Sequence, residues 1–150
     1  MMTTTVQKLA GFLHLGRIPP LLRSQLEAEG RILYLAEGIV ETAVFRDFRA
    51  PGAYCSHRWI AFVGFLVLSQ KRLVVKARFA HQISINIPYE DPRFHKLTFK
   101  ATPKMLSVAF DASLQGPGIS GQLEVRAHLP DVATVAAILQ RVGAQVKLME

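Results

Sequence analysis

Short apolar segments separated by turn residues follow one another from Gly38 to Leu129, and one amphipathic segment comes after them. Connections of only a few residues are typical of antiparallel sheets, because parallel strands need a crossover of a dozen or more residues. This order predicts a mainly β fold, a sandwich or partly open barrel, with a single C-terminal helix capping it.

Seven strands are expected in the β body, over residues 31–129. Two of them, the third and the last, alternate apolar and polar residues, which indicates one buried and one exposed face. Within the first strand, Gly38 predicts a bulge or a break, and the first hairpin turns at Ala50-Pro51-Gly52. The strands are predicted at residues 32–48, 59–68, 72–79, 83–87, 97–100, 106–110 and 121–129.

Three helices are expected around these strands. Residues 1–29 predict two short N-terminal helices, the second beginning at Pro20, since the first helical position needs no N–H donor. Residues 130–142 predict the capping helix, with Pro130 in its first turn and Gly143 after its end. The apolar stripes are Val6, Leu9, Phe12 and Leu13 in the first helix and Val132, Val135, Ala136, Leu139 and Val142 in the last.

The strand from Trp59 to Leu68 is apolar on both faces. A second layer must therefore cover its outer face. The favoured cover is the first N-terminal helix. The alternatives are a membrane surface or a partner subunit, which would make the chain a homodimer through this strand. At ten residues the segment is too short to span a bilayer, which takes about 20.

Size and cysteine content limit the class of protein. The chain has 150 residues, half of them hydrophobic, so we expect one domain over residues 1–150 that needs no disulfide, metal or cofactor. The single cysteine, Cys55, has no intramolecular partner, and the first residues lack a signal-peptide pattern. We expect a cytoplasmic protein, peripheral to the membrane if it binds one.

Positive charge is concentrated in the middle of the chain. Residues 46–104 hold eleven Lys or Arg against three acidic residues, while the whole chain carries a net charge of +7. Such an excess attracts anionic surfaces, and salt weakens the attraction. The alternative is that these side chains only solvate exposed strand faces. The candidate binding residues, all on the first three strands, are Arg46, Arg49, Arg58, Arg72, Lys76 and Arg78.

Short motifs resemble a known family. The sequence GFLVLSQKRL at residues 64–73 is similar to the glycine, leucine, threonine, arginine and leucine pattern of GRAM-type pleckstrin-homology-like domains, with Ser69 where threonine is usual. RAPG at residues 49–52 and SGQLEVR at residues 120–126 resemble bacterial members of that group. The resemblance covers roughly residues 27–142.

The resemblance implies two nearly orthogonal antiparallel sheets, a C-terminal helix that caps one corner, and no enzymatic activity. Members of the group bind phosphoinositides, other anionic lipids or protein segments. Those that bind phosphoinositides have a lysine and an arginine-x-arginine triplet around the first hairpin, whereas here Trp59 follows Arg58 and the triplet is missing. The expected ligand is therefore an anionic membrane surface or a protein segment.

Two residues of the motif also have structural explanations. A glycine within a strand, such as Gly64, is typical of a bulge or of a close backbone approach. An arginine just after a turn, such as Arg72, can tie the hairpin to a neighbouring carboxylate or carbonyl. We expect both residues to stabilise the fold.

Other classes of function are weaker alternatives. Cys55 and His57 are two residues apart, so they would point to the same side of a strand, and a cysteine-dependent hydrolase is one alternative. No third residue is placed to orient the histidine, however, and no metal-binding spacing is present. A small β cup that carries an apolar ligand is another, although Val, Leu, Ile and Phe point inward and predict a solid core. Nucleic-acid binding is not expected, because most aromatic residues follow the core pattern.

Overall fold

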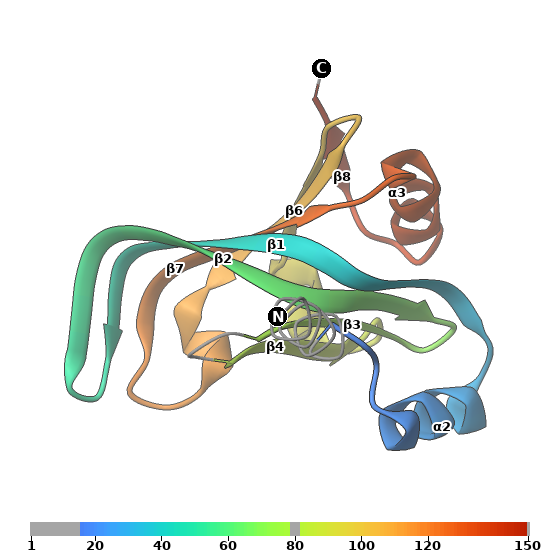
Figure 1. Cartoon of the computed structure of the whole chain (residues 1–150), viewed down its shortest axis with the longest axis horizontal. Coiled ribbons are helices and arrows are strands. Elements are labelled where there is room, and N and C mark those ends of the chain that lie inside the picture. The colour runs from blue at the N-terminus through green and yellow to red at the C-terminus, as the bar shows by residue number, and fades with distance from the viewer. Residues whose placement is uncertain (1–15, 79–81, 150) are drawn as a thin grey trace, which may run out of the picture.

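The computed structural model describes residues 16–78 and 82–149, and it is mainly β, as predicted (Figure 1). Eight strands form one curled, half-barrel sheet in the order β4-β3-β2-β1-β7-β6-β5-β8. The first predicted helix falls in residues 1–15 and lies outside the described residues. The elements are α2 Pro20–Glu29, β1 Ile32–Ala50, β2 Ala53–Ser69, β3 Arg72–Arg78, β4 Gln82–Pro88, β5 Thr98–Ala101, β6 Met105–Asp111, β7 Ser120–His128, α3 Val132–Arg141 and β8 Val146–Leu148, with 3-10 helices η1 Pro92–Lys96 and η2 Ala112–Gln115.

The sheet is continuous because β1 is long enough to pair with a strand from each half of the sheet. This strand has 19 residues; it pairs with β2 on one edge and, over residues 41–49, with β7 on the other. The two separate sheets that the resemblance implied are thus joined by hydrogen bonds into one. The register shifts between Ala36 and Ile39, which confirms the bulge expected at Gly38.

Two strand predictions need correction. β2 begins at Ala53, not at Trp59, because its first residues pair with β1 across the predicted turn although they are mostly polar. An eighth strand, β8, pairs in parallel with β5. Its three residues are too few for a periodic pattern to reveal a strand.

The main hydrophobic core fills the concave side of the sheet, and α3 packs onto it at the end formed by β5, β6 and β8. The predicted apolar stripe of α3 faces this core, and Ile138 joins it. The hydroxyl of Tyr34 donates a hydrogen bond to Asp131 at the start of the helix, and Gly143, with a φ of 99°, follows its end. The predicted role of this helix as a cap is confirmed.

A second, smaller apolar cluster lies on the outer face of β2 and β3. Leu26 of α2 packs there with Phe65, Val67 and Val74. The outer face of β2 is therefore covered in part by the second N-terminal helix; the favoured cover, with Val6, Leu9, Phe12 and Leu13, lies outside the described residues. Toward its N-terminal end the same strand is open, because Trp59 is 66% exposed.

Gly64 lies where two strands approach closely, as predicted. A β-carbon at this position would overlap the carbonyl oxygen of Lys76 on β3 and Oε2 of Glu41 on β1. The neighbouring turn is closed by Ser69, whose Oγ accepts hydrogen bonds from the backbone N–H groups of Lys71 (3.2 Å) and Arg72 (3.0 Å). Both motif residues, Gly64 and Ser69, thus stabilise the β2–β3 hairpin.

Candidate functional site: the β1–β2 arm

The first hairpin extends beyond β3 and bends downward at the left of Figure 1, with the start of β7 beside it. We call its outer part, residues 45–60, the arm. β3 pairs with β2 only over residues 63–68, so the arm is formed by β1, β2 and the start of β7. A projecting ribbon of this kind presents side chains on two sides, which we call the groove side and the outer side.

Three of the six predicted binding residues lie on the arm. The guanidinium of Arg49 lies over the ring of Tyr54, 5.0 Å from its centroid, and Arg58 is exposed beside the groove. Arg46 is on the outer side, where its Nη1 is 3.4 Å from Oε2 of Glu124. Among the described residues no carboxylate lies within ion-pair distance of Arg49 or Arg58. These two cations are available to an external anion.

The other three predicted residues lie away from the arm, on β3. Nη2 of Arg72 is 2.7 Å from Oε2 of Glu29, and its Nη1 donates to Oδ1 of Asn86 at 3.0 Å. Lys76 is half-buried in the middle of the strand, and the side chain of Arg78 lies outside the described part. The structure therefore does not gather the six cations on one surface, and Arg72 has the structural role expected of it.

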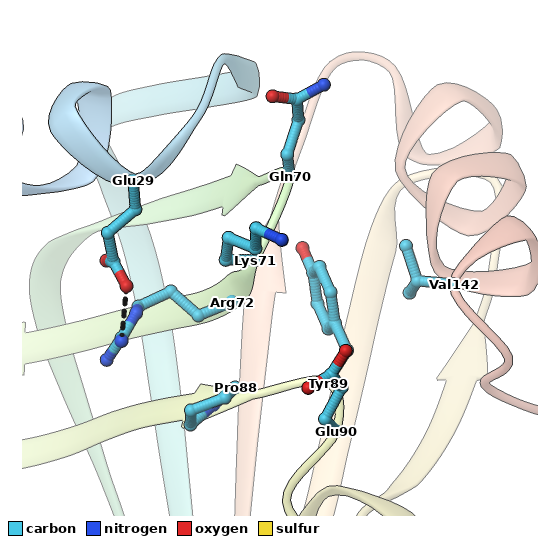
Figure 2. A pocket seen from close by; sticks show the side chains of 8 residues that line it. All are labelled: Glu29, Gln70, Lys71, Arg72, Pro88, Tyr89, Glu90 and Val142. Atoms are coloured by element: carbon cyan, nitrogen blue, oxygen red, sulfur yellow. Dashed lines mark hydrogen bonds and ion pairs between the residues drawn. The ribbon is translucent and has the colours of Figure 1, made fainter.

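A pocket of about 550 Å³ surrounds this arginine (Figure 2). Figure 2 shows the Glu29–Arg72 ion pair on one side and Tyr89 facing Val142 on the other. The hydroxyl of Tyr89 donates to the carbonyl of Ser69 at 2.7 Å, and burial raises the pKa of this tyrosine. The contacts of Arg72 with Glu29 and Asn86, and of Tyr89 with Ser69, connect α2, the β2–β3 turn and β4 at this pocket.

We predict that Arg72→Met lowers the free energy of unfolding by about 1 kcal/mol, because the ion pair with Glu29 is only partly buried. Urea denaturation measures this loss. Arg72→Lys should recover part of it, because it restores the charge without the second hydrogen bond. Equal stability of Arg72→Met and the wild type would show that the pair does not hold α2 to the sheet.

The groove side of the arm holds a mostly apolar hollow of about 380 Å³. Phe45 and Leu123, both buried, form its floor, and Arg58 lies at its edge. Cys55, the single cysteine, is half-buried in the wall. The remaining lining residues are Phe48, Ala50, Pro51, Ala53, Tyr54, Ile60, Gln115 and Ile119.

The outer side holds a smaller hollow of about 230 Å³, lined by Arg46, His57 and Trp59 among others. Glu124 lies beside it and accepts hydrogen bonds from Nε of Arg126 (2.7 Å) and Oγ of Ser107 (2.9 Å). Burial alone would raise the pKa of Glu124, but these hydrogen bonds outweigh it and lower the pKa. Both arginines on this side, Arg46 and Arg126, therefore share one internal carboxylate.

Cys55 and His57 line different sides of the arm, contrary to the expectation that they point the same way. On the paired strand β1, Asp47 has a φ of 47°, and the β1–β7 register shifts between Arg46 and Arg49. On both strands, residues two apart at this point line different hollows: Arg46 and Phe48 on β1, and His57 and Cys55 on β2. The geometric argument for a thiol–imidazole pair is thereby removed.

Glu41 is the residue that the sequence analysis missed. It is fully buried on β1, and neither carboxylate oxygen has a hydrogen-bond partner. Burial raises its pKa to about 9, so the side chain is protonated at neutral pH. The only signal in the sequence is one acidic residue within an apolar strand, which reads equally well as an exposed position.

No helix within residues 16–78 and 82–149 is long and apolar enough to cross a membrane. In the same ranges no cluster of three or more His, Cys, Asp or Glu side chains is arranged to bind a metal ion. No family model, curated protein or solved structure matches the chain.

Proposed function

We propose that the protein is a non-enzymatic binding module that attaches to an anionic membrane surface through the end of its arm. The observation that carries the proposal is the presence on one hairpin of the 60% exposed ring of Tyr54 and two cations, Arg49 and Arg58, that have no ion-pair partner among the described residues; Arg49 and Tyr54 lie at the tip, and Arg58 lies further along. Tyrosine and tryptophan rings favour the membrane–water interface. A basic residue near an anionic bilayer contributes about 1 kcal/mol.

A bilayer fits these features better than an ordered protein partner does. The exposed groups lie on both sides of the arm, Tyr54 and Arg58 at the groove and Trp59 on the outer side, which suits a diffuse layer of head groups more than a single complementary surface. Trp59 lies further from the turn on the outer side, where it would reach the head-group layer of a tilted arm. The resemblance to pleckstrin-homology-like domains, with the first hairpin central to the sheet and a C-terminal helix on the core, supports the same class of function.

Co-sedimentation with vesicles tests the proposal. The wild type should pellet with vesicles that contain phosphatidylglycerol and not with phosphatidylcholine alone, and physiological salt should weaken binding. Arg49→Glu combined with Arg58→Glu should reduce the affinity about thirtyfold or more, because two contributions of about 1 kcal/mol are lost.

A matched control separates the effect of the arm cations on binding from the effect of the net charge. Lys100→Glu with Lys147→Glu makes the same change in charge on two exposed residues of β5 and β8, at the far edge of the sheet. This variant should keep most of the binding. Equal loss in both double variants would mean that total charge alone attracts the protein, and no pelleting of the wild type at either salt would leave a protein segment as the ligand class.

A further inference from the structure

We infer that the groove on the arm accepts the hydrocarbon tail of an anionic lipid and that Arg58 binds its head group. This inference rests on the proposed function, since it names what the arm takes from the membrane surface. The occupant follows from two observations that meet at one place: an apolar hollow of about 380 Å³ and, at its edge, an exposed cation for which the described residues supply no counter-ion.

The hollow has the size and lining of a small-molecule site. Such sites span about 300–1,000 Å³ and are mostly apolar, with a few polar groups that fix the orientation of the ligand. Here Phe45 and Leu123 form the floor, while Phe48, Ile60 and Ile119, each half-buried, form the walls. A hydrocarbon tail would cover the exposed parts of these side chains, at a gain of about 0.8 kcal/mol per buried methylene.

The position of the groove relates it to the tip. Its lining begins at Ala50, Pro51 and Ala53 of the turn and continues to Leu123 on β7. A lipid reached by the tip therefore meets the apolar surface directly. In the register of the hairpin Arg58 lies opposite Phe45, so its guanidinium projects from the same side of the ribbon as the floor of the groove.

Charge distinguishes the groove side of the arm from the outer side. The hollow on the outer side contains Arg46 and Arg126, but Glu124 pairs with both. Within residues 16–78 and 82–149 Arg58 has no such partner, and its exposed N–H groups can bind a phosphate or carboxylate. An anionic head group is thus expected on the groove side and not on the outer side.

Cys55 provides a direct readout, because it is the only cysteine and lies in the wall of the groove. We would measure its rate of reaction with a disulfide reagent in the presence of lysophosphatidylglycerol below its critical micelle concentration. The lipid should slow the reaction at least fivefold at saturation. Lysophosphatidylcholine with the same tail is the matched neutral lipid, and it should protect at about fivefold higher concentration, which is the contribution of one cation.

Variants on the two sides of the ribbon complete the test. Arg58→Leu should weaken protection by lysophosphatidylglycerol about fivefold and abolish its advantage over lysophosphatidylcholine. Arg46→Leu, on the outer side, should leave unchanged both the protection by lysophosphatidylglycerol and its advantage over lysophosphatidylcholine. An unchanged thiol reaction rate with lipid, or equal protection by both lipids in the wild type, would overturn the inference.

Alkylation of Cys55 with a bulky maleimide in the folded protein separates this inference from the proposed function. If lysophosphatidylglycerol fails to protect the thiol while wild-type and alkylated proteins pellet equally with anionic vesicles, the groove inference is wrong and surface binding stands. If the lipid protects the thiol but the wild type never pellets, the proposed membrane attachment is wrong and the groove is a site for monomeric lipid. Protection together with weaker pelleting of the alkylated protein supports both.

Discussion

Replacement of Glu41 by Gln is expected to stabilise the protein at neutral and alkaline pH. The folded protein keeps Glu41 protonated up to about pH 9, because the side chain is buried and the described residues supply no hydrogen-bond partner for its carboxyl oxygens. In the unfolded chain the same group ionises around its ordinary pKa of 4.5. Between the unfolded and the folded pKa, ionisation of Glu41 in the unfolded chain lowers the free energy of unfolding by about 1.4 kcal/mol per pH unit. At pH 7 the loss amounts to about 3 kcal/mol.

The sign of the effect follows from the direction of the shift. The stability of the wild type has its full value below the unfolded pKa of Glu41 and is lost as the pH rises toward the folded pKa. Glu41→Gln is neutral in both states, so its stability should be nearly constant over the same range. Urea denaturation at several pH values between about 5 and 9 measures both curves.

An exposed carboxylate supplies the control. Glu27, whose side chain is 55% exposed and pairs with Arg23 on α2, can be changed to Gln in the same way. The stability of Glu27→Gln should fall with rising pH as that of the wild type does. Glu124 does not disturb the comparison, because its pKa is lowered and its contribution is lost only as the pH falls below the range measured. A Glu41→Gln curve parallel to that of the wild type would show that Glu41 is ionised in the folded protein.

Gly64→Ala is expected to destabilise the protein strongly. The new β-carbon would overlap the carbonyl oxygen of Lys76, which belongs to the backbone and cannot move without breaking the β2–β3 pairing. We predict a loss of at least about 3 kcal/mol in the free energy of unfolding, measured by thermal or urea denaturation.

Gly52→Ala is the comparison that isolates this clash. Gly52 has a φ of 75° in the hairpin turn, and no heavy atom lies within 4 Å of an added β-carbon. Gly52→Ala should therefore lower the free energy of unfolding only by the strain of a left-handed backbone, about 1–2 kcal/mol. If Gly64→Ala destabilised the protein no more than Gly52→Ala, the close approach between β2 and β3 would be wrong.

Local patterns predicted the parts of the fold in which each residue's surroundings come from its own element. The alternation of β3 and β7 and the stripe of α3 are visible within each element, and the roles of Gly64 and Arg72 follow from their positions in the β2–β3 hairpin. The start of β2 was placed six residues late because residues 53–58 are polar, although pairing with β1 alone suffices to extend the strand. Strand length in a hairpin is set by the partner strand as much as by its own residues.

The candidate site depends on features that sequence patterns do not record. Trp59 fits the apolar alternation of β2, yet it is exposed because β3 does not extend beside it. Cys55 and His57 line different sides of the arm next to the irregularity at Asp47, and a non-glycine residue with positive φ has no reliable signal in one sequence. The compensation of Arg46 by Glu124, 78 positions away, likewise requires the register of β1 with β7.

The central claim is that the tip of the arm enters the interface of an anionic bilayer, and a tryptophan placed at the tip tests it most directly. Trp59 is the only tryptophan, so Trp59→Phe with Tyr54→Trp moves the fluorophore to the tip, and Trp59→Phe with Leu21→Trp moves it to α2, on the opposite side of the molecule in Figure 1. Both new positions are exposed, with Tyr54 60% and Leu21 72% accessible in the native chain. Phosphatidylglycerol vesicles should shift the emission of the tip tryptophan to shorter wavelength and leave that of the α2 tryptophan unchanged. No shift at position 54, or the same shift at both positions, would contradict attachment through the arm.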